Sequence, residues 1–205
     1  MWTREAGGTH EVGGSLIVDP RSRRDPRSGR NMITIRDYRS SDAKEIVKWI
    51  HTEEEFRLWS ANCFKVYPMT AQDLIEYYDS FKDADYYFPM TACDEDGIFG
   101  HFIFRFLDEE HKLLRMGFVI VDDLCRGMGY GKAMMNKALE YAFEVLKVDK
   151  VTLGVFEQNK AAYECYLSVG FEVDPEKPAE EYLIGKEKWT TVELYCVCED
   201  EKERA

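Results

Sequence analysis

Three alternating glycines between an arginine and a lysine form the first pattern in this chain that suggests chemistry. Gly127, Gly129 and Gly131 lie within "VDDLCRGMGYGKAMM", directly after an apolar run. Glycine destabilises the interior of a helix, so the three glycines must serve a purpose other than helix formation. Where a glycine loop enters a helix, its backbone N–H groups can converge on an anion, helped by the helix dipole. With Arg126 and Lys132 beside it, the loop favours a phosphate site over an ordinary strand-to-helix turn.

Two familiar nucleotide-binding motifs do not fit this loop. A Walker loop needs the spacing GxxxxGK[ST], but Gly127 to Gly131 is one residue short and Ala133 follows Lys132. A Rossmann fingerprint needs GxGxxG near the first strand, whereas this loop lies mid-chain with the spacing GxGxG. The phosphate must therefore belong to another kind of ligand.

A second pattern follows downstream in "NKAAYECYLSVGF". Asn159 suits the N-cap of a short helix. Tyr166 shares an apolar helix face with Ala162 and Val169, and by itself it is interpreted as a core aromatic residue. Gly170 ends the helix. Without further context, both the asparagine and the tyrosine have purely structural explanations.

Taken together, the two patterns resemble the signatures of the GNAT superfamily of N-acetyltransferases. The motif [RQ]-x-x-G-x-[GA] matches Arg126, Gly129 and Gly131, and N-x-x-A-x-x-x-Y-x-x-x-G-F matches the segment 159–171. The segment "DAKEIVKWI" is similar to the first helix of the RimJ/RimL-type branch. The resemblance extends from about Met32 to Cys198.

The resemblance implies acetyl-coenzyme A as co-substrate and assigns site residues. The pantetheine arm is expected to pair with the backbone of Val119, Ile120 and Val121, where the strand splays from its neighbour and an N–H group polarises the thioester oxygen. Tyr166 is then the general acid for the departing thiolate, and Asn159 caps the helix and touches the co-substrate. The pyrophosphate is expected on the loop residues Arg126, Gly127, Met128, Gly129, Tyr130, Gly131 and Lys132.

The general base stays unassigned. Some relatives that acetylate protein N-termini carry a glutamate five residues before the asparagine, but Gly154 stands there in this chain. Glu157 would face another way on a regular strand, which leaves two alternatives: a water chain accepts the proton, or the amine arrives already neutral. The resemblance implies a primary amine acceptor, either a small molecule or a peptide N-terminus. The alternative is a non-catalytic acyl-coenzyme A binding module in which Tyr166 is purely structural.

The elements that must position these residues follow from apolar periodicity. The nearly continuous apolar run 113–121 predicts a central strand, and spacing in 130–146 predicts an amphipathic helix. Further strands are expected at 32–39, 85–93, 97–106, 150–156, 171–173 and 189–198, helices at 40–50, 52–60, 70–81 and 159–169, and a polar loop at 174–187. This order predicts a three-layer α/β domain (α+β in some schemes). Its central mixed, mostly antiparallel twisted sheet has about seven strands and is flanked by helices.

Composition narrows the function further. The chain has 205 residues and a net charge of −12, which argues against nucleic-acid binding and is compatible with cationic substrates. Its six cysteines and four histidines show no metal-ligand spacing, so no metal is expected. No apolar run suits a membrane span or a secretory signal. We expect a soluble cytoplasmic monomer or homodimer.

The ends of the chain differ from its middle. Residues 1–31 are rich in Gly, Arg, Ser and Pro with little periodicity, which predicts disorder. This leader is a native tail, a tag or an overextended start. The N-acetyltransferase domain is expected at 32–198, followed by a charged tail at 199–205.

Overall fold

The computed structural model describes residues 32–198, so the expectations for 1–31 and 199–205 lie outside the described residues. Most elements expected from the sequence are present. In chain order they are β1 (Thr34–Asp37), α1 (Ala43–Ile46), α2 (Glu53–Ser60), α3 (Ala71–Asp79), β2 (Tyr87–Asp94), β3 (Gly97–Phe106), β4 (Leu113–Val121), α4 (Tyr130–Glu140), β5 (Lys150–Phe156), α5 (Lys160–Leu167), β6 (Glu172–Val173), β7 (Glu180–Ile184) and β8 (Glu187–Val197).

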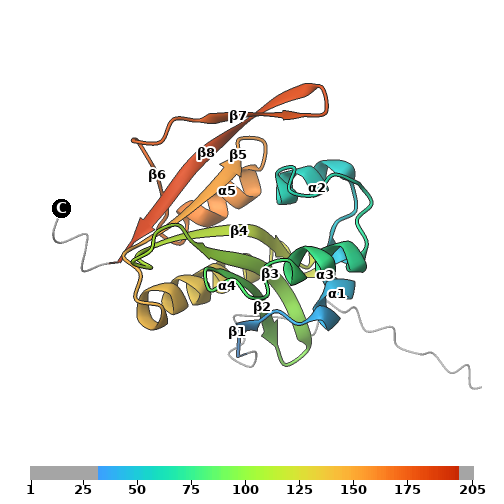
Figure 1. Cartoon of the computed structure of the whole chain (residues 1–205), viewed down its shortest axis with the longest axis horizontal. Helices are drawn as coiled ribbons and strands as arrows, with labels where there is room; N and C mark the ends of the chain where they lie inside the picture. Colours follow the sequence, from blue (N-terminus) through green and yellow to red (C-terminus); the bar gives the residue numbers. More distant parts are fainter. Residues whose placement is uncertain (1–31, 199–205) are drawn as a thin grey trace, which may run out of the picture.

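The strands form one mixed, mostly antiparallel sheet in the order β1-β2-β3-β4-β5-β8-β6, with β7 on β8 (Figure 1). The parallel pair is β4 and β5, joined through α4. This crossover puts β4 at the centre of the sheet, as its continuous apolar sequence predicts.

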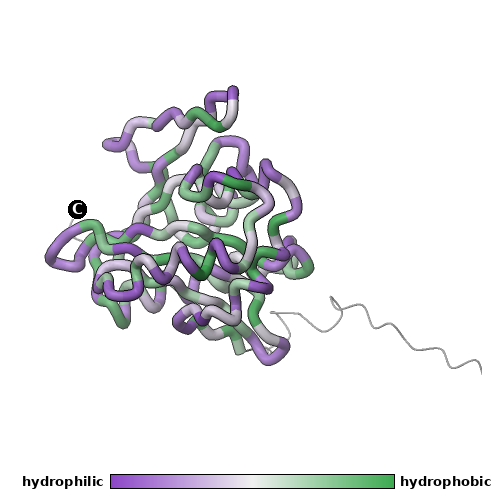
Figure 2. The backbone as a smooth tube through the Cα atoms, turned by 45° about the vertical axis from the view of Figure 1, so that its right-hand side comes forward, coloured by the Kyte–Doolittle hydropathy of each residue, from purple (hydrophilic) through white to green (hydrophobic). Residues whose placement is uncertain are grey.

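The expectation of a polar loop at 174–187 is wrong, because Glu180–Ile184 forms β7 and pairs with β8. This strand brings the sheet to eight strands, where about seven were expected. Ile184 is buried while Leu183 is exposed, so the segment does alternate. Gly185, with φ of +62°, closes the turn. The charged residues around the alternation concealed it. The β7–β8 hairpin projects beyond the other described residues, at the top of Figure 2.

Helices cover both faces of the sheet, and the alternation of β3 shows how (Figure 1). Phe102 and Phe104 point into the larger core cluster, which includes α4 and α5. His101 and Ile103 point into a second cluster with α1, α2 and α3. We call these two sides of the sheet the α4 face and the α2 face. A third, small cluster joins Phe156 to Ile184 and Trp189 below the hairpin.

The first expected helix, 40–50, is broken into short pieces. A 3₁₀ turn, Ser40–Asp42, leads into α1, and a second one, Val47–Trp49, follows it. The β-branched Ile46 and Val47 pack well but favour regular helix less than unbranched side chains do. Ile50 is already extended, which sends the chain towards α2. At its other end, α4 continues into a π-helical turn, Tyr141–Val145.

Candidate active site

The glycine loop lies between β4 and α4, as its sequence predicts. Gly127 and Gly129 have φ of +74° and +91°, a left-handed region that glycine adopts without strain. Gly129 is the N-cap of α4. Gly131 lies inside the first turn, where an added Cβ would stand 3.6 Å from Cys165 Sγ. Two of the glycines are therefore needed for backbone conformation, and the third lies at the close approach of α4 to α5.

The start of α4 lacks the groups that normally satisfy a helix N-terminus. α2 and α3 begin with capping boxes from Thr52 and Thr70, and the Asn159 side chain caps α5. At α4 no side chain provides a cap, and no acidic residue stands in the first turn. The first backbone N–H groups of a helix have no intrahelical acceptor. These amides, with Lys132 beside them, fit an anionic group such as a pyrophosphate.

The Arg126 side chain is held by the protein itself. Its guanidinium donates to Val121 O at 3.0 Å, to Trp49 O at 2.8 Å and to Glu55 Oε1 at 3.0 Å. These bonds tie the loop to β4 and to the chain around α2. Any contact of Arg126 with the co-substrate would therefore be made by its backbone, and that contact stays a prediction.

The side chains of Met128 and Tyr130 also serve the core. Met128 packs against the cluster on the α4 face. Tyr130 is fully buried, and its hydroxyl donates to Asp94 Oδ2 at 3.1 Å. Both side chains thus help to fix the position of the loop.

β4 and β5 separate close to their N-terminal ends. Their parallel register pairs Leu113–Arg115 with Lys150–Thr152 and goes no further. Beyond Arg115, no described strand pairs with the β5-side edge of β4. Free N–H and C=O groups on a strand edge can pair with an extended ligand as with an added strand. Val119, Ile120 and Val121 lie on this stretch, so the splay expected there is present.

A β-bulge at Phe118, which sequence reasoning missed, shapes this edge. The β3–β4 register shifts between the pairs Ile103↔Gly117 and His101↔Ile120. Phe118 has a φ of +50°, which is strained for a bulky residue. As a result Val119 and Val121 pack on the α4 face, and Ile120 packs on the α2 face.

Trp59 of α2 holds the bulge in place. Its indole Nε1–H donates to Phe118 O at 2.7 Å, and the two rings lie 5.2 Å apart. Phe64 and Tyr77 pack against the Phe118 ring as well. The aromatic residues of "EEEFRLWS" and its neighbours were the available signal, but only the fold shows which carbonyl they reach.

Asn159 and Tyr166 lie on α5, directly after β5. Asn159 Oδ1 accepts the N–H of Ala162 at 3.3 Å, which confirms the cap. Tyr166 is 7% exposed and packs within the cluster on the α4 face, 6.0 Å from the Phe171 ring. Burial, with a smaller contribution from Cys165, raises the pKa of Tyr166 above its ordinary value. The phenol therefore keeps its proton at neutral pH, as a general acid must.

No glutamate side chain projects from the strand position that carries one in some relatives. Gly154 stands there, and the space above it is filled by the side chains of Arg115 and Glu193. Glu157 is exposed beyond the end of β5. Glu193 was not identified from the sequence, because nothing in "WTTVELYCVC" separates it from an ordinary exposed strand residue.

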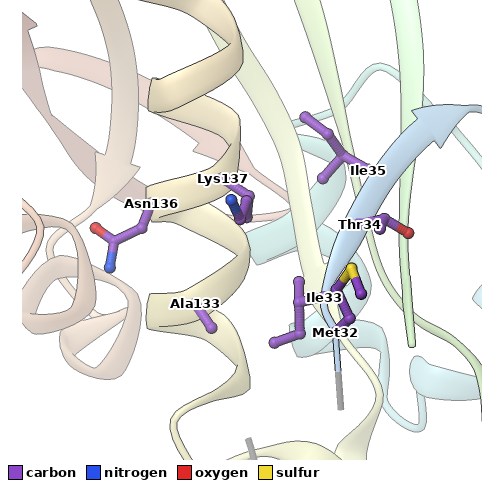
Figure 3. Close-up of a pocket in the computed structure, with 7 residues that line it drawn as sticks. All are labelled: Met32, Ile33, Thr34, Ile35, Ala133, Asn136 and Lys137. Carbon is purple, nitrogen blue, oxygen red and sulfur yellow. The ribbon is translucent and has the colours of Figure 1, made fainter. Parts of the chain in front are cut away.

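An open groove of about 590 Å³ lies elsewhere, between β1 and α4 (Figure 3). It contains none of the predicted site residues and no pair of titratable groups, so it offers no chemistry. Its lining is Met32, Ile33, Thr34, Ile35, Ala133, Asn136 and Lys137. Residues 32–198 contain no group of three or more His, Cys, Asp or Glu side chains suited to a metal ion. In the same range, no helix combines the length and apolar character needed to cross a membrane.

Comparison with known proteins agrees with this geometry. Residues 47–171 match the acetyltransferase (GNAT) family model. The spermine/spermidine N(1)-acetyltransferase of Bacillus subtilis is 28% identical over 100 residues, which cover 46% of this chain and 66% of the relative. The L-amino acid N-acetyltransferase AaaT of Escherichia coli is 27% identical over 86 residues, covering 42% and 53%. The matched segments thus span between about half and two thirds of these relatives.

The fold has close counterparts among solved structures. The spermidine N-acetyltransferase from Vibrio cholerae in complex with CoA and spermine superposes with a TM-score of 0.68 at 19% identity, covering 80% of this chain and 95% of that chain. At this identity the likeness concerns the fold alone. The family match covers the glycine loop, the parted strands and α5 together, and the chain belongs to the GNAT acetyltransferase family.

Proposed function

We propose that this chain is an N-acetyltransferase that moves the acetyl group of acetyl-coenzyme A to a primary amine by direct attack in a ternary complex. The observation that carries the proposal is the early parting of β4 from β5 beside the uncapped start of α4. An open strand edge next to a helix start without a side-chain cap matches a ligand with an amide-bearing arm and a pyrophosphate.

Each site residue has a part in the proposed reaction. The backbone of the loop from Arg126 to Lys132 binds the pyrophosphate, and Asn159 touches the co-substrate while capping α5. The backbone of Val119–Val121 orients the arm, which brings the thioester to the parted strands. The amine nitrogen bonds to the acetyl carbon, the carbon–sulfur bond breaks, and Tyr166 gives its proton to the leaving thiolate. Solvent takes up the proton that the amine loses and returns one to Tyr166.

The relatives suggest which amines to examine first. Those matched are named for spermine, spermidine and L-amino acids, all of which carry amino groups. A net charge of −12 favours cationic acceptors over anionic ones and disfavours nucleic acid. Polyamines therefore head the list, followed by amino acids and peptide N-termini.

The experiment is a mass-spectrometric screen with acetyl-coenzyme A. Polyamines, aminoglycosides, amino acids and N-terminal peptides are each incubated with the full chain, and the acetylated product is measured together with free coenzyme A. Stoichiometric formation of both supports the proposal. Binding of acetyl-coenzyme A without product from any amine contradicts it and favours a non-catalytic binding module, which the deep burial of Tyr166 also fits.

Three narrower expectations belong to the same proposal. We propose that the chain belongs to the RimJ/RimL-type branch, that the protein acts in the cytoplasm, and that it is a monomer or homodimer. They are supported by the "DAKEIVKWI" segment and the acidic composition. Light scattering coupled to size-exclusion chromatography tests the oligomeric state.

A further inference from the structure

An ion pair occupies the space that a side chain at position 154 would take. Gly154 of β5 lies directly opposite Glu193 of β8 in the antiparallel register. A Cβ on Gly154 would stand 2.6 Å from Glu193 Oε1 and 2.8 Å from Arg115 Nη2. A side chain on residue 154 would therefore require the ends of the Glu193 and Arg115 side chains to shift. The carboxylate in this space is therefore delivered from β8 and not from β5.

The pair is bidentate and sits where the strands part. Arg115 Nη1 and Glu193 Oε2 are 2.5 Å apart, and Nη2 and Oε1 are 2.9 Å apart. The Glu193 side chain is 11% exposed and that of Arg115 is 28% exposed. Arg115 is also the last residue of β4 that pairs with β5. The carboxylate therefore lies at the origin of the opening between the two strands.

The Glu193 carboxylate and the Tyr166 phenol lie on opposite faces of the sheet. Leu114, Leu153 and Leu194 pack on the α4 face together with Tyr166. Successive side chains of a strand alternate, so their neighbours Arg115, Gly154 and Glu193 project from the α2 face. Direct attack needs an acid for the leaving thiolate and a group that positions the amine, and these two residues would supply them from the two faces.

The charges around the pair favour a cation. Tyr182 of β7 donates its hydroxyl to Glu180 Oε2 at 2.9 Å, and both residues lie within electrostatic range of Arg115. Two carboxylates around one guanidinium leave a net negative charge. A carboxylate has about four acceptor positions, of which a bidentate arginine occupies two, so Glu193 can accept further N–H groups.

We propose that Glu193 is the residue that binds the acceptor amine, with Arg115 as the positioning residue that orients its carboxylate towards the parted strands. The proposal rests on the proposed function. It also gives the acceptor class, an amine that carries positive charge. The competing explanation is a structural strap in which the pair holds β4 to β8 and touches no substrate.

The test compares Glu193→Gln with wild type, with spermidine as the probe amine. The amide keeps the size of the side chain and removes its charge. We expect the KM for spermidine to rise roughly 10–100-fold, the range for one charge-assisted hydrogen bond, and the KM for acetyl-coenzyme A to stay within about twofold. Glu181→Gln is the matched control. It removes the same charge from the same hairpin, where Lys188 Nζ donates to Glu181 Oε2 at 2.7 Å, and should leave both constants unchanged.

A second variant moves the carboxylate between strands. Gly154→Glu combined with Glu193→Ala returns a carboxylate to the same space from β5. In a folded double variant, the KM for spermidine should recover at least about tenfold relative to Glu193→Ala alone, since a hydrogen bond to a charged group is worth that much. A structural strap predicts no such recovery, and a folded double variant without it contradicts the proposal.

The outcomes separate this proposal from the proposed function. If wild type acetylates spermidine and Glu193→Gln alters only thermal stability, or raises both KM values equally, Glu193 is a strap and the enzyme assignment stands. If wild type acetylates no amine, the proposed function fails first, and the amine-binding role of Glu193 fails with it.

Discussion

The guanidinium of Arg126 and the carboxylate of Glu55, 71 residues apart in the sequence, form an ion pair with Nη1 and Oε1 3.0 Å apart. Glu55 also closes the capping box of α2 with Thr52. Partial burial acts to raise the pKa of Glu55, but hydrogen bonds from the His51 N–H and from Arg126 outweigh it and keep the pKa low. The start of α2 is thereby coupled to the glycine loop.

Glu55→Gln should weaken acetyl-coenzyme A binding slightly. Glutamine preserves the capping box, but the ion pair is lost. Because the two side chains are 34% and 40% exposed, solvent screens the pair, and its worth lies at the lower end of about 0.2–1 kcal/mol. We expect the dissociation constant, measured by calorimetry, to rise about twofold. Glu53→Gln, which breaks a pair with Arg57 inside α2, should not change it. An equal effect from both variants would show that the start of α2 is not coupled to the glycine loop.

Gly129→Val should abolish tight binding of acetyl-coenzyme A while the fold survives. A β-branched side chain is strained at φ of +91°, and under the proposed function it would stand where the backbone approaches the pyrophosphate. Gly185→Val is the matched control, because its φ is +62° and open space surrounds it in the β7–β8 turn. Urea unfolding should show losses of about 1–3 kcal/mol for both. Only Gly129→Val should lower the affinity, by more than about tenfold; equal affinities would mean that the loop does not bind the co-substrate.

Tyr166→Phe separates catalysis from packing. The variant keeps the ring and loses the hydroxyl, so stability should change by about 1 kcal/mol at most. If Tyr166 protonates the thiolate, the single-turnover rate should fall roughly 10²–10⁴-fold, with little change in acetyl-coenzyme A affinity. Tyr163→Phe, which alters a half-buried tyrosine on the same helix, is the control. A chemical step as fast as that of wild type would leave Tyr166 a core residue.

His101 should make the protein sensitive to mild acid. It is fully buried, Tyr78 Oη lies 2.6 Å from its Nε2, and burial lowers the pKa of His101 to about 3 from an ordinary 6.5. The unfolded chain binds this proton below pH 6.5 and the folded chain does not. The stability is therefore fully present above pH 6.5 and is lost as the pH falls towards 3.

The measurement is urea unfolding between pH 6.5 and 5, above the range where most carboxylates titrate. The free energy of unfolding should fall with a slope approaching about 1.4 kcal/mol per pH unit from this residue. His101→Phe leaves the Tyr78 hydroxyl unpaired and costs about 1–3 kcal/mol at every pH, but it should remove that slope. A slope unchanged by the substitution would show that other groups cause it.

Sequence reasoning predicted the elements that have strong local signals. The boundaries of β3, β4 and β5 coincide with those expected, because each is an apolar run between turns. The caps at Thr70 and Asn159 could be predicted equally well, because a capping side chain bonds to a backbone N–H group within three residues of itself. β7 was missed because its charged residues dominate the composition.

What the sequence did not predict depends on contacts between distant residues. The Phe118 bulge is invisible in "LLRMGFVIV", because it follows from the register with β3 and from the Trp59 indole. The sequence suggests that Arg126 is a cation beside a phosphate-binding loop. In the structure, its guanidinium instead donates hydrogen bonds to Glu55 Oε1 and to Trp49 O. In the sequence, Gly154 indicates only that the glutamate of some relatives is absent. In the structure, the Glu193 side chain fills that space from another strand. Local patterns carry none of these pairings.

The bulge makes β4 tolerant of a change in length at one position. Gly117 and Phe118 both face the α2 side, since a Cβ on Gly117 would meet the Ile103 side chain there. Deleting Phe118 would thus leave Val119, Ile120 and Val121 on their present faces, although the Phe118 ring would be lost from the cluster on the α2 face. It would nevertheless draw the glycine loop about 3.3 Å back along the strand, the rise of one residue. A single residue thus sets how far along the sheet the glycine loop and the start of α4 lie, without changing which face the side chains of Val119, Ile120 and Val121 occupy.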